Sequence, residues 1–377
     1  MILSDTQAMV RDTMRAFAQE RLWPNAPAWD RDHHFPREEL QALGALGALG
    51  MVVAEADGGA GSDYVSLAVA IEEIAAGDGS TSTVVSVQNS VVCGPLERFG
   101  TASQKARYLP PLARGDHLGC FCLTEPHVGS DAAALTTRAE RKGDRYVLNG
   151  VKQFITTGKN ADTAIVFAVT DKAAGKRGIS AFVVDTRTPG YRVARIEEKL
   201  GQRASDTAQI AFEQCEVPVE NRLGQEGDGY RIALANLEAG RIGIGAQSVG
   251  MARSAFDAAI AYARERATFG KPIVNHQAVN FRLADMATEI EVARQMVWHA
   301  ATLRDHGLPC LREAAMAKLF ASEMAERVVS AALQVHGGYG YVNDFPVERI
   351  YRDVRVCQIY EGTSDIQRMV IGRDLLR

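Results

Sequence analysis

One glutamate of the sequence stands where a carboxylate could act as a general base. Glu361 precedes Gly362, Thr363 and Ser364, so it occupies a turn directly before a helix whose N-cap is Thr363 or Ser364. General-base chemistry needs a carboxylate or imidazole held close to the proton it removes. An acid at a helix start is also favoured by the helix dipole alone. The residue types therefore leave both a catalytic and a purely structural role open for Glu361.

Two further segments have residue types that bind ligands. In residues 120–132, the hydroxyls of Thr124 and Ser130 and the backbone amides of a small-residue loop could hold a polar planar ligand or a phosphate. An ordinary surface turn has the same composition. The second segment contains Gly337-Gly338, which ends a long helical pattern and lets another group approach the backbone closely.

Motifs for several other chemistries are absent. The sequence has no GxGxxG fingerprint, no P-loop, no HExxH and no GxSxG. Its six cysteines form no CxxC pair and have no histidine at zinc-finger spacing, so we expect reduced, buried thiols and no metal site. The adjacent His33-His34 pair cannot share a helix face, which favours a solvated turn there.

Composition is that of an ordinary globular protein. The chain has 377 residues, of which 46% are apolar and 23% charged, and at about 150 residues per domain this predicts two or three domains. The net charge of −4 provides no overall field toward nucleic acid or anionic lipid, so we expect neither partner and only local anion sites. Acidic residues near the start argue against a leader. We expect a mature chain in the cytoplasm, or in the mitochondrial matrix if a transit peptide has been removed.

Three regions differ in their hydrophobic period. Residues 1–119 are expected to be helical, beginning with a capping box of Ser4 and Gln7. Residues 120–226 contain short runs rich in β-branched and aromatic residues, which predict a compact antiparallel β domain. Residues 227–377 return to helical period and predict a four-helix bundle. We therefore expect an α+β protein with these three domains.

The expected elements inside these regions can be placed along the chain. The strand runs are 145–148, 151–156, 164–169, 179–184 and 208–212, and the bundle helices are 230–267, 279–305, 312–335 and a last one from residue 363. Asn149-Gly150 lies between the first two strand runs and is a strong hairpin signal.

Taken together, these segments resemble the acyl-CoA dehydrogenase family over essentially the whole length. The first family signature matches residues 121–130, with Thr-Glu-Pro at 124–126 and Gly-Ser-Asp at 129–131, and the second matches residues 334–368. The resemblance implies the helical, β, helical architecture, an FAD cofactor bound without a Rossmann fold, and a homotetramer.

The resemblance places the flavin ring in the middle of the chain. The ring would lie against residues 121–130 and 154–156, where Phe154 replaces the usual Trp and retains an aromatic wall. His127 stands where some relatives have glycine, and its side chain restricts the loop backbone. The cofactor residues implied here are Phe121, Leu123, Thr124, Gly129, Ser130, Phe154, Ile155, Thr156, Thr363 and Asp365.

A second cofactor group would come from a neighbouring subunit. Arg266, Phe269 and Gln277 match residues that hold the pyrophosphate and adenine side, and Gln334, Gly337 and Gly338 match residues contributed across the interface. This makes oligomerisation part of cofactor binding. A solvated cation at a helix end is the plainer interpretation of Arg266.

The resemblance also assigns the chemistry. The reaction removes an α-proton and a β-hydride from an acyl-CoA thioester, so it needs a base, donors to the developing enolate and a dry site. Some relatives carry the glutamate directly before Arg241, where this chain has Gly240, so Glu361 is the matching base. Its own N–H and an FAD hydroxyl would polarise the thioester carbonyl. Ser130, Arg241 and Tyr360 are the substrate-binding candidates, and Arg241 would help keep the base ionised.

The implied activity is FAD-dependent formation of a trans-2-enoyl-CoA, with electrons leaving to an electron-transfer flavoprotein. Residues 86–95 resemble short-chain members, so we expect a short or short branched acyl-CoA. Four alternatives remain: a catalytically silent CoA-binding scaffold, an oxidase, a desulfinase and a nitroalkane oxidase. An oxidase would need a second helical bundle, and the retained Glu361 argues against the last two.

Overall fold

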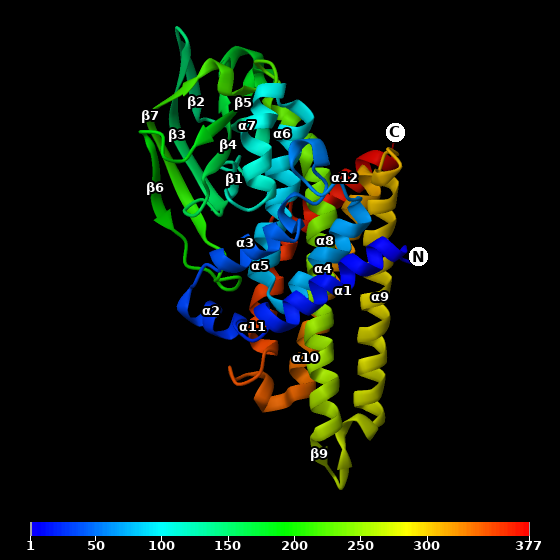
Figure 1. Cartoon of the computed structure of the whole chain (residues 1–377). Helices are drawn as coiled ribbons and strands as arrows, with labels where there is room; N and C mark the ends of the chain where they lie inside the picture. Colours follow the sequence, from blue (N-terminus) through cyan, green and yellow to red (C-terminus); the bar gives the residue numbers. More distant parts are fainter. Residues whose placement is uncertain (1, 377) are drawn as a thin grey trace.

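Seven helices form the first part of the chain. The computed structural model describes residues 2–376, and Figure 1 shows α6 and α7 beside the sheet and α1 and α4 beside the long helices of the bundle. The predicted capping box is confirmed, because Ser4 Oγ accepts from the Gln7 N–H at 3.3 Å and Gln7 Oε1 accepts from the Ser4 N–H at 3.0 Å. The helices are α1 (Asp5–Phe17), α2 (Ala26–Asp32), α3 (Arg37–Ala45), α4 (Tyr64–Gly77), α5 (Gly79–Val87), α6 (Gly94–Phe99) and α7 (Ala102–Ala113).

The central sheet has the order β6-β7-β3-β2-β4-β5-β8, with β1 paired to β4. Most pairs are antiparallel, as predicted, but β1 pairs with β4 in parallel and β2 meets β4 in parallel at one end. The predicted antiparallel β domain is therefore confirmed, with β1 as a parallel addition to β4. The strands are β1 (Gly119–Cys122), β2 (Arg138–Lys142), β3 (Arg145–Thr156), β4 (Thr163–Val169), β5 (Ile179–Asp185), β6 (Tyr191–Ile196), β7 (Thr207–Pro218) and β8 (Arg222–Leu223).

The hairpin predicted at Asn149-Gly150 is wrong. Both residues lie inside β3, where the register to β7 shifts between Leu148 and Gly150. Gly150 has φ of +151°, and a Cβ on it would lie 2.5 Å from Thr137 Oγ1. The glycine is therefore needed for a β-bulge and for the close approach of Thr137, the residue before β2, and both features favour glycine as a hairpin turn does.

The last part of the chain is the predicted helical bundle. Figure 1 shows α8, α9 and α10 as long neighbouring helices, with the short β9–β10 hairpin at the end of the bundle away from the sheet. The helix α11 was not predicted. The elements are α8 (Gly229–Glu265), β9 (Ala267–Thr268), β10 (Lys271–Pro272), α9 (Gln277–Asp305), α10 (Leu311–His336), α11 (Val347–Val354) and α12 (Ser364–Leu375).

Buried charges join the two helical parts. Glu72 and Glu73 of α4 are both almost fully buried. Arg253 of α8 contacts both carboxylates, Arg294 of α9 pairs with Glu72, and Arg15 of α1 pairs with Glu73. This cluster satisfies the buried carboxylates and ties α1, α4, α8 and α9 together.

All six cysteines are buried and free, as predicted. Over residues 2–376, none of the helices has the length and apolar character needed to cross a membrane.

Candidate active site

The turn before α12 holds Glu361 in an uncommon backbone conformation. Glu361 has φ of +55° and Gly362 has φ of +88°. The helix then begins at Thr363, whose Oγ1 accepts from the Ile366 N–H at 3.3 Å, so the predicted N-cap is confirmed. A helix-start acid does not need a positive φ, and strained residues cluster at functional sites. The conformation therefore favours the catalytic interpretation of Glu361.

The Glu361 carboxylate is buried beside two cations and lacks a full set of hydrogen bonds. Its Oε2 has no hydrogen-bond partner among the described residues. Burial raises the pKa of Glu361 to about 7, while the positive charges of Arg241 and then Lys318 oppose the rise. A carboxyl group that titrates near neutrality is suited to take up a proton.

Arg241 lies on α8 and is only 5% exposed. Its Nε and Nη1 have no acceptor within residues 2–376. Burial lowers the pKa of Arg241, and the charges of Glu361 and Glu238 act in the opposite direction. Buried polar groups are almost always paired, so the unpaired donors of Arg241 beside an unpaired carboxylate oxygen indicate a place for a ligand.

Gly240 lies directly under the Glu361 carboxylate. A Cβ on Gly240 would be 2.6 Å from Glu361 Oε2 and 2.8 Å from its Cδ. A side chain at the position that carries the alternative base in some relatives would therefore displace the Glu361 carboxylate.

Tyr360 is anchored by a buried network of side chains. Its hydroxyl donates to Gln247 Oε1 and accepts from Gln202 Nε2, the latter at 3.3 Å. Thr83 Oγ1 accepts from Gln247 Nε2 at 2.5 Å and lies 2.6 Å from Gln202 Oε1, to which it donates. Burial raises the pKa of Tyr360. The hydroxyl is thus used inside the protein, and the ring of Tyr360 is partly buried against the helical core.

The loop after β1 is fastened to β3 by a buried ion pair. Lys152 Nζ donates to Glu125 Oε1 at 2.9 Å and to the Leu123 carbonyl at 3.0 Å. The Gln153 N–H donates to the Thr124 carbonyl at 2.8 Å. Lys152 opposes the effect of burial, and the pKa of Glu125 falls to about 2. The predicted flavin segment is therefore held at its backbone, with the Thr124 side chain left free of this contact.

The aromatic residue next to this loop points outward. Phe154 is 63% exposed and has φ of +57°, at a register shift between Lys152 and Ile155. Bulges of this kind re-aim side chains beside active sites. The Ile155 side chain is instead buried in the β core, and Thr156 pairs with Thr207. Any contact of Ile155 with a ligand is thus made by its backbone.

The other predicted flavin-side residues differ in exposure. Phe121 packs edge-on against Phe167, with ring centroids 4.8 Å apart. Gly129 and Ser130 are exposed on the loop, and Asp365 is exposed at the start of α12.

The second predicted cofactor group lies at the far end of the bundle. Arg266, Gly337 and Gly338 line one cavity of about 590 Å³, and Figure 1 shows the adjoining β9 at the end opposite to the sheet. Phe269 beside them is 96% exposed, with φ of +50°. Gln277 and Gln334 are exposed on α9 and α10. The structure thus brings Arg266, Gly337 and Gly338 together, does not place Phe269, Gln277 or Gln334 in the lining of this cavity, and separates the cavity from the flavin loop of the same chain.

This cavity fits the anionic middle of a dinucleotide. Arg266 forms no ion pair with any described residue. A Cβ on Gly337 or Gly338 would meet nothing within 4 Å, so the backbone is open to a ligand. His336 Nδ1 is 2.8 Å from the Ala332 carbonyl, and its buried Nε2 has no partner in the described part of the chain. A cation, an open backbone and a spare ring nitrogen are the groups that a pyrophosphate and a ribose need.

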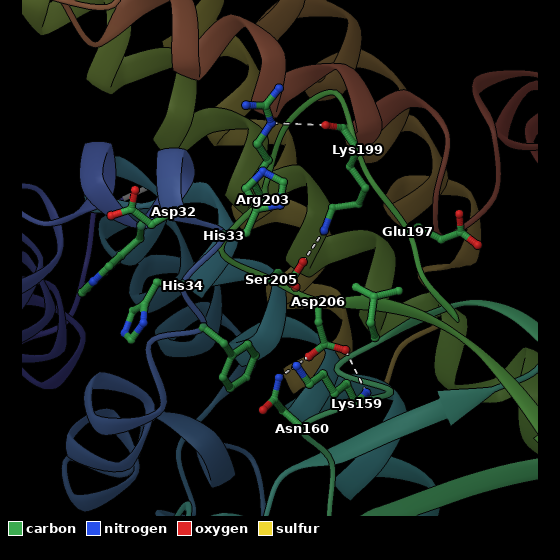
Figure 2. A pocket seen from close by; sticks show the side chains of 13 residues that line it. Asp32, His33, His34, Lys159, Asn160, Glu197, Lys199, Arg203, Ser205 and Asp206 are labelled. Carbon is green, nitrogen blue, oxygen red and sulfur yellow. Dashed lines mark hydrogen bonds between the residues drawn. The ribbon is translucent and has the colours of Figure 1, made fainter. Parts of the chain in front are cut away.

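A separate polar cavity of about 580 Å³ lies between α2 and the β6–β7 loop. Figure 2 shows His33 and His34 on one side of it, and Lys199, Ser205 and Asp206 on the other. The predicted catalytic, substrate and cofactor residues are not among those that line it. No cluster of three or more metal-ligating side chains occurs over residues 2–376, and the two histidines belong to none.

Sequence reasoning missed the buried polar residues behind the site. Lys318, Gln247 and Lys152 are fully buried. The signal for Lys318 was present, because it is a single cation in an alanine-rich stretch of α10. Gln247 has no such signal, since its partners Thr83 and Tyr360 lie more than a hundred residues away.

Comparison with known proteins agrees with this architecture. Three family models match in order: the acyl-CoA dehydrogenase N-terminal domain at residues 4–116, the middle domain at 120–215 and the C-terminal domain at 227–376. The human "Short-chain specific acyl-CoA dehydrogenase, mitochondrial" is 48% identical over 375 residues, covering 100% of this chain and 91% of that protein.

Two solved structures extend the likeness to three dimensions. Butyryl-CoA dehydrogenase from Megasphaera elsdenii has a TM-score of 0.98 and 41% identity, covering 100% of both chains. A chain from a structure described as the electron transferring flavoprotein of Acidaminococcus fermentans has a TM-score of 0.99 and 46% identity, covering 100% of this chain and 99% of that one. This chain therefore belongs to the acyl-CoA dehydrogenase family and is an oxidoreductase of the flavoprotein type.

Proposed function

We propose that this acyl-CoA dehydrogenase uses Glu361 to remove the α-proton of a short or short branched acyl-CoA, which yields the trans-2-enoyl-CoA. One observation carries the proposal. Glu361 combines a buried carboxylate oxygen without a partner and a backbone N–H for which the described residues supply no acceptor. A proton acceptor and a hydrogen-bond donor on one residue are what the α-carbon and the thioester carbonyl require.

FAD is the proposed cofactor, held by two groups of residues. The loop 121–130, with Phe154 and Thr156, would contact the flavin within one subunit. Arg266, Gly337 and Gly338 of a neighbouring subunit would hold the pyrophosphate side, which is supported by their separation from the loop in a single chain. When bound, FAD supplies the acceptor for the β-hydrogen and its electron pair.

The residues around Glu361 have distinct proposed tasks. The charges of Arg241 and Lys318 favour the ionised carboxylate against burial. The carboxylate takes the α-proton, while the Glu361 N–H stabilises negative charge that develops on the thioester oxygen. The ring of Tyr360, fixed through its hydroxyl, and Ser130 on the loop are the other proposed substrate contacts. Burial excludes water from the reacting carbons.

The preference for a short acyl chain is supported by the named relatives and by local packing. The segment 86–95 contains the π-helical turn Gln88–Cys93, which is fully buried. Ser86 lies against α8 so closely that a Cβ on Gly243 would be 2.3 Å from Ser86 Oγ. Close packing at this point leaves little room for a long apolar chain between α5 and α8.

We also propose three domains at residues 1–119, 120–226 and 227–377, a homotetramer, and an electron-transfer flavoprotein as acceptor. The split cofactor site supports oligomerisation, because one chain holds both halves at opposite ends. The similarity to a chain from the structure described as the electron transferring flavoprotein of Acidaminococcus fermentans supports the acceptor.

The decisive experiment is anaerobic titration of the purified protein with acyl-CoAs. The expected result is a yellow protein whose flavin bleaches with butyryl- or isobutyryl-CoA and more slowly with palmitoyl-CoA. A protein that binds FAD and acyl-CoA without bleaching would be the silent scaffold. Faster bleaching by palmitoyl-CoA would contradict the short-chain preference, and rapid turnover with oxygen alone would contradict the proposed acceptor.

A further inference from the structure

Two buried side chains hold the carbonyl groups of the Glu361 turn. Lys318 Nζ donates to the Gly362 carbonyl at 2.8 Å. Gln367 Nε2 donates to the same carbonyl at 2.8 Å and to the Glu361 carbonyl at 3.1 Å. Both side chains are 0% exposed. The acceptors of this strained turn are thus satisfied by side chains from α10 and α12.

The donor side of the turn is left open. The Glu361 N–H has no acceptor among the described residues, and its Oε2 has no donor. Lys318 and Gln367 hold the backbone of the turn through its carbonyl groups. The Glu361 N–H and carboxylate, which the reaction needs, are therefore not used to hold the turn. The division is what a preorganised site requires, since groups already engaged within the protein are not free to stabilise a transition state.

Lysine is a costly residue at such a position. Burying an ammonium group carries a large desolvation penalty, and an apolar side chain would fill the same space without it. Burial lowers the pKa of Lys318 to about 8, with the charges of Cys357 and Glu361 acting in the opposite direction. A purely structural role for position 318 does not need this charge, whereas an anionic base beside it does.

We propose that Lys318, together with Gln367, is a positioning residue for the base: it fixes the Gly362 carbonyl and places a positive charge beside the Glu361 carboxylate. This inference rests on the proposed function of Glu361. It assigns to α10 a part in proton abstraction although Lys318 touches Glu361 only through the turn.

The test compares four holoenzyme variants. Lys318→Met removes the charge and the hydrogen bond and keeps a side chain of similar length, whereas Lys318→Gln removes the charge and retains an N–H donor. Gln367→Met removes the uncharged donor to the Gly362 and Glu361 carbonyls. Ser322→Ala is the matched control, because Ser322 is also 0% exposed on α10 and its hydroxyl bonds within that helix. Each variant is assayed with butyryl-CoA and with α-deuterated butyryl-CoA.

Lys318→Met is expected to lower kcat about 10- to 100-fold with KM within a few-fold of the parent, because proton abstraction slows while binding contacts remain. The α-deuterium isotope effect should rise. Hydrogen exchange of the peptide 357–366 should quicken, a measurement that does not depend on activity. Gln367→Met should change exchange similarly with a smaller loss of kcat, and Ser322→Ala should match the parent.

The pH profile separates charge from geometry. The charged groups that face Glu361 are Arg241 from α8 and Lys318 from α10. Removing the Lys318 charge should move the acidic limb of kcat/KM to higher pH in both Lys318→Met and Lys318→Gln, and leave it in place in Gln367→Met.

The inference would be overturned if Lys318→Met kept the parental kcat, isotope effect and hydrogen exchange of the peptide 357–366. It would also be overturned if Lys318→Met lost only thermal stability. If Lys318→Met does not fold, Lys318→Gln and Gln367→Met decide, and parental behaviour in both is equally contrary. Glu361→Gln distinguishes the two levels. If that variant retains turnover, the base itself is misassigned; if it is inactive while the Lys318 variants are normal, only the positioning role fails.

Discussion

Gly240 and Glu361 share one small space between α8 and the turn before α12. A Cβ on Gly240 would lie 2.6 Å from Glu361 Oε2, a separation that real Cβ atoms essentially never show. A side chain at position 240 would therefore push the end of the Glu361 side chain out of its present position. A glycine inside a helix costs stability relative to alanine, so its presence in the middle of α8 has a packing reason.

Gly240→Ala should displace the Glu361 carboxylate. We expect kcat to fall at least about tenfold, because a misplaced general base loses much of its 10²- to 10⁴-fold contribution. Thermal stability should change little, since better helix propensity opposes the new contact. Gly372→Ala in α12 is the control, because a Cβ there meets nothing within 4 Å. Parental kcat in Gly240→Ala would mean that the carboxylate has another productive position.

Glu361→Gln should abolish proton abstraction while preserving the fold of the turn. The amide has the size of the carboxylate and leaves the backbone N–H in place, so acyl-CoA should still perturb the flavin spectrum without bleaching it. The expected loss in the rate of flavin reduction is at least about 10²- to 10⁴-fold. Glu289→Gln, which removes an acid paired with Arg327 on the surface, should retain the parental rate. Reduction of Glu361→Gln within a few-fold of the parent would return Glu361 to a helix-start role.

Activity should rise with pH through about 7, the value to which burial raises the pKa of Glu361. The base acts only when ionised, so kcat/KM measured over pH 5 to 9 should show an acidic limb there. The contribution of Glu361 to folding stability depends on pH in the opposite direction. The folded pKa lies above the ordinary value of 4.5, so the contribution of this group is full below about 4.5 and is lost as pH rises through about 7. The free energy of unfolding of the apoprotein, measured with denaturant, should therefore fall between about pH 4.5 and 7 in the parent, and this fall should be absent in Glu361→Gln. The same pH dependence in both proteins would contradict the argument that burial raises the pKa of Glu361.

The Glu125–Lys152 pair should control the stability of the flavin loop. Lys152→Met leaves a carboxylate buried without its partner, which typically costs about 3–5 kcal/mol of unfolding free energy. The folded pKa of Glu125 is about 2, below its ordinary 4.5, so its contribution is present above about 4.5 and is lost as pH falls through about 2. In Lys152→Met this loss should begin at higher pH, and FAD should dissociate more readily. If the acid-unfolding curve of Lys152→Met coincided with that of the parent, the Glu125–Lys152 pair would contribute nothing to stability.

The sequence was informative where the chemistry is local. The Ser4 cap, the N-cap at Thr363 and the end of α10 at Gly337 depend on residues within one turn, and all three are present. Asn149-Gly150 was misleading because the choice between a hairpin and a bulge depends on pairing with the distant β7. The hydrogen bond from Lys318 to the Gly362 carbonyl could likewise not be predicted, since no local sequence pattern indicates which carbonyl a buried lysine contacts.

The last prediction concerns the division of the cofactor site between subunits. If Glu361 of one subunit works with Arg266 of its neighbour, a Glu361→Gln subunit and an Arg266→Glu subunit each lack one half. Co-expression should then restore activity, because a mixed pair contains one site with an intact Glu361 and an intact neighbouring Arg266. Random pairing of equal amounts should recover about a quarter of the parental sites, as expected for a two-fold interface. Each variant expressed alone should stay inactive, and mixtures of the two purified variants that cannot exchange subunits should stay inactive too. Failure of co-expression to restore bleaching, with mixed oligomers verified by two different tags, would place Arg266 and Glu361 in the same subunit's site or leave Arg266 as the solvated helix-end cation.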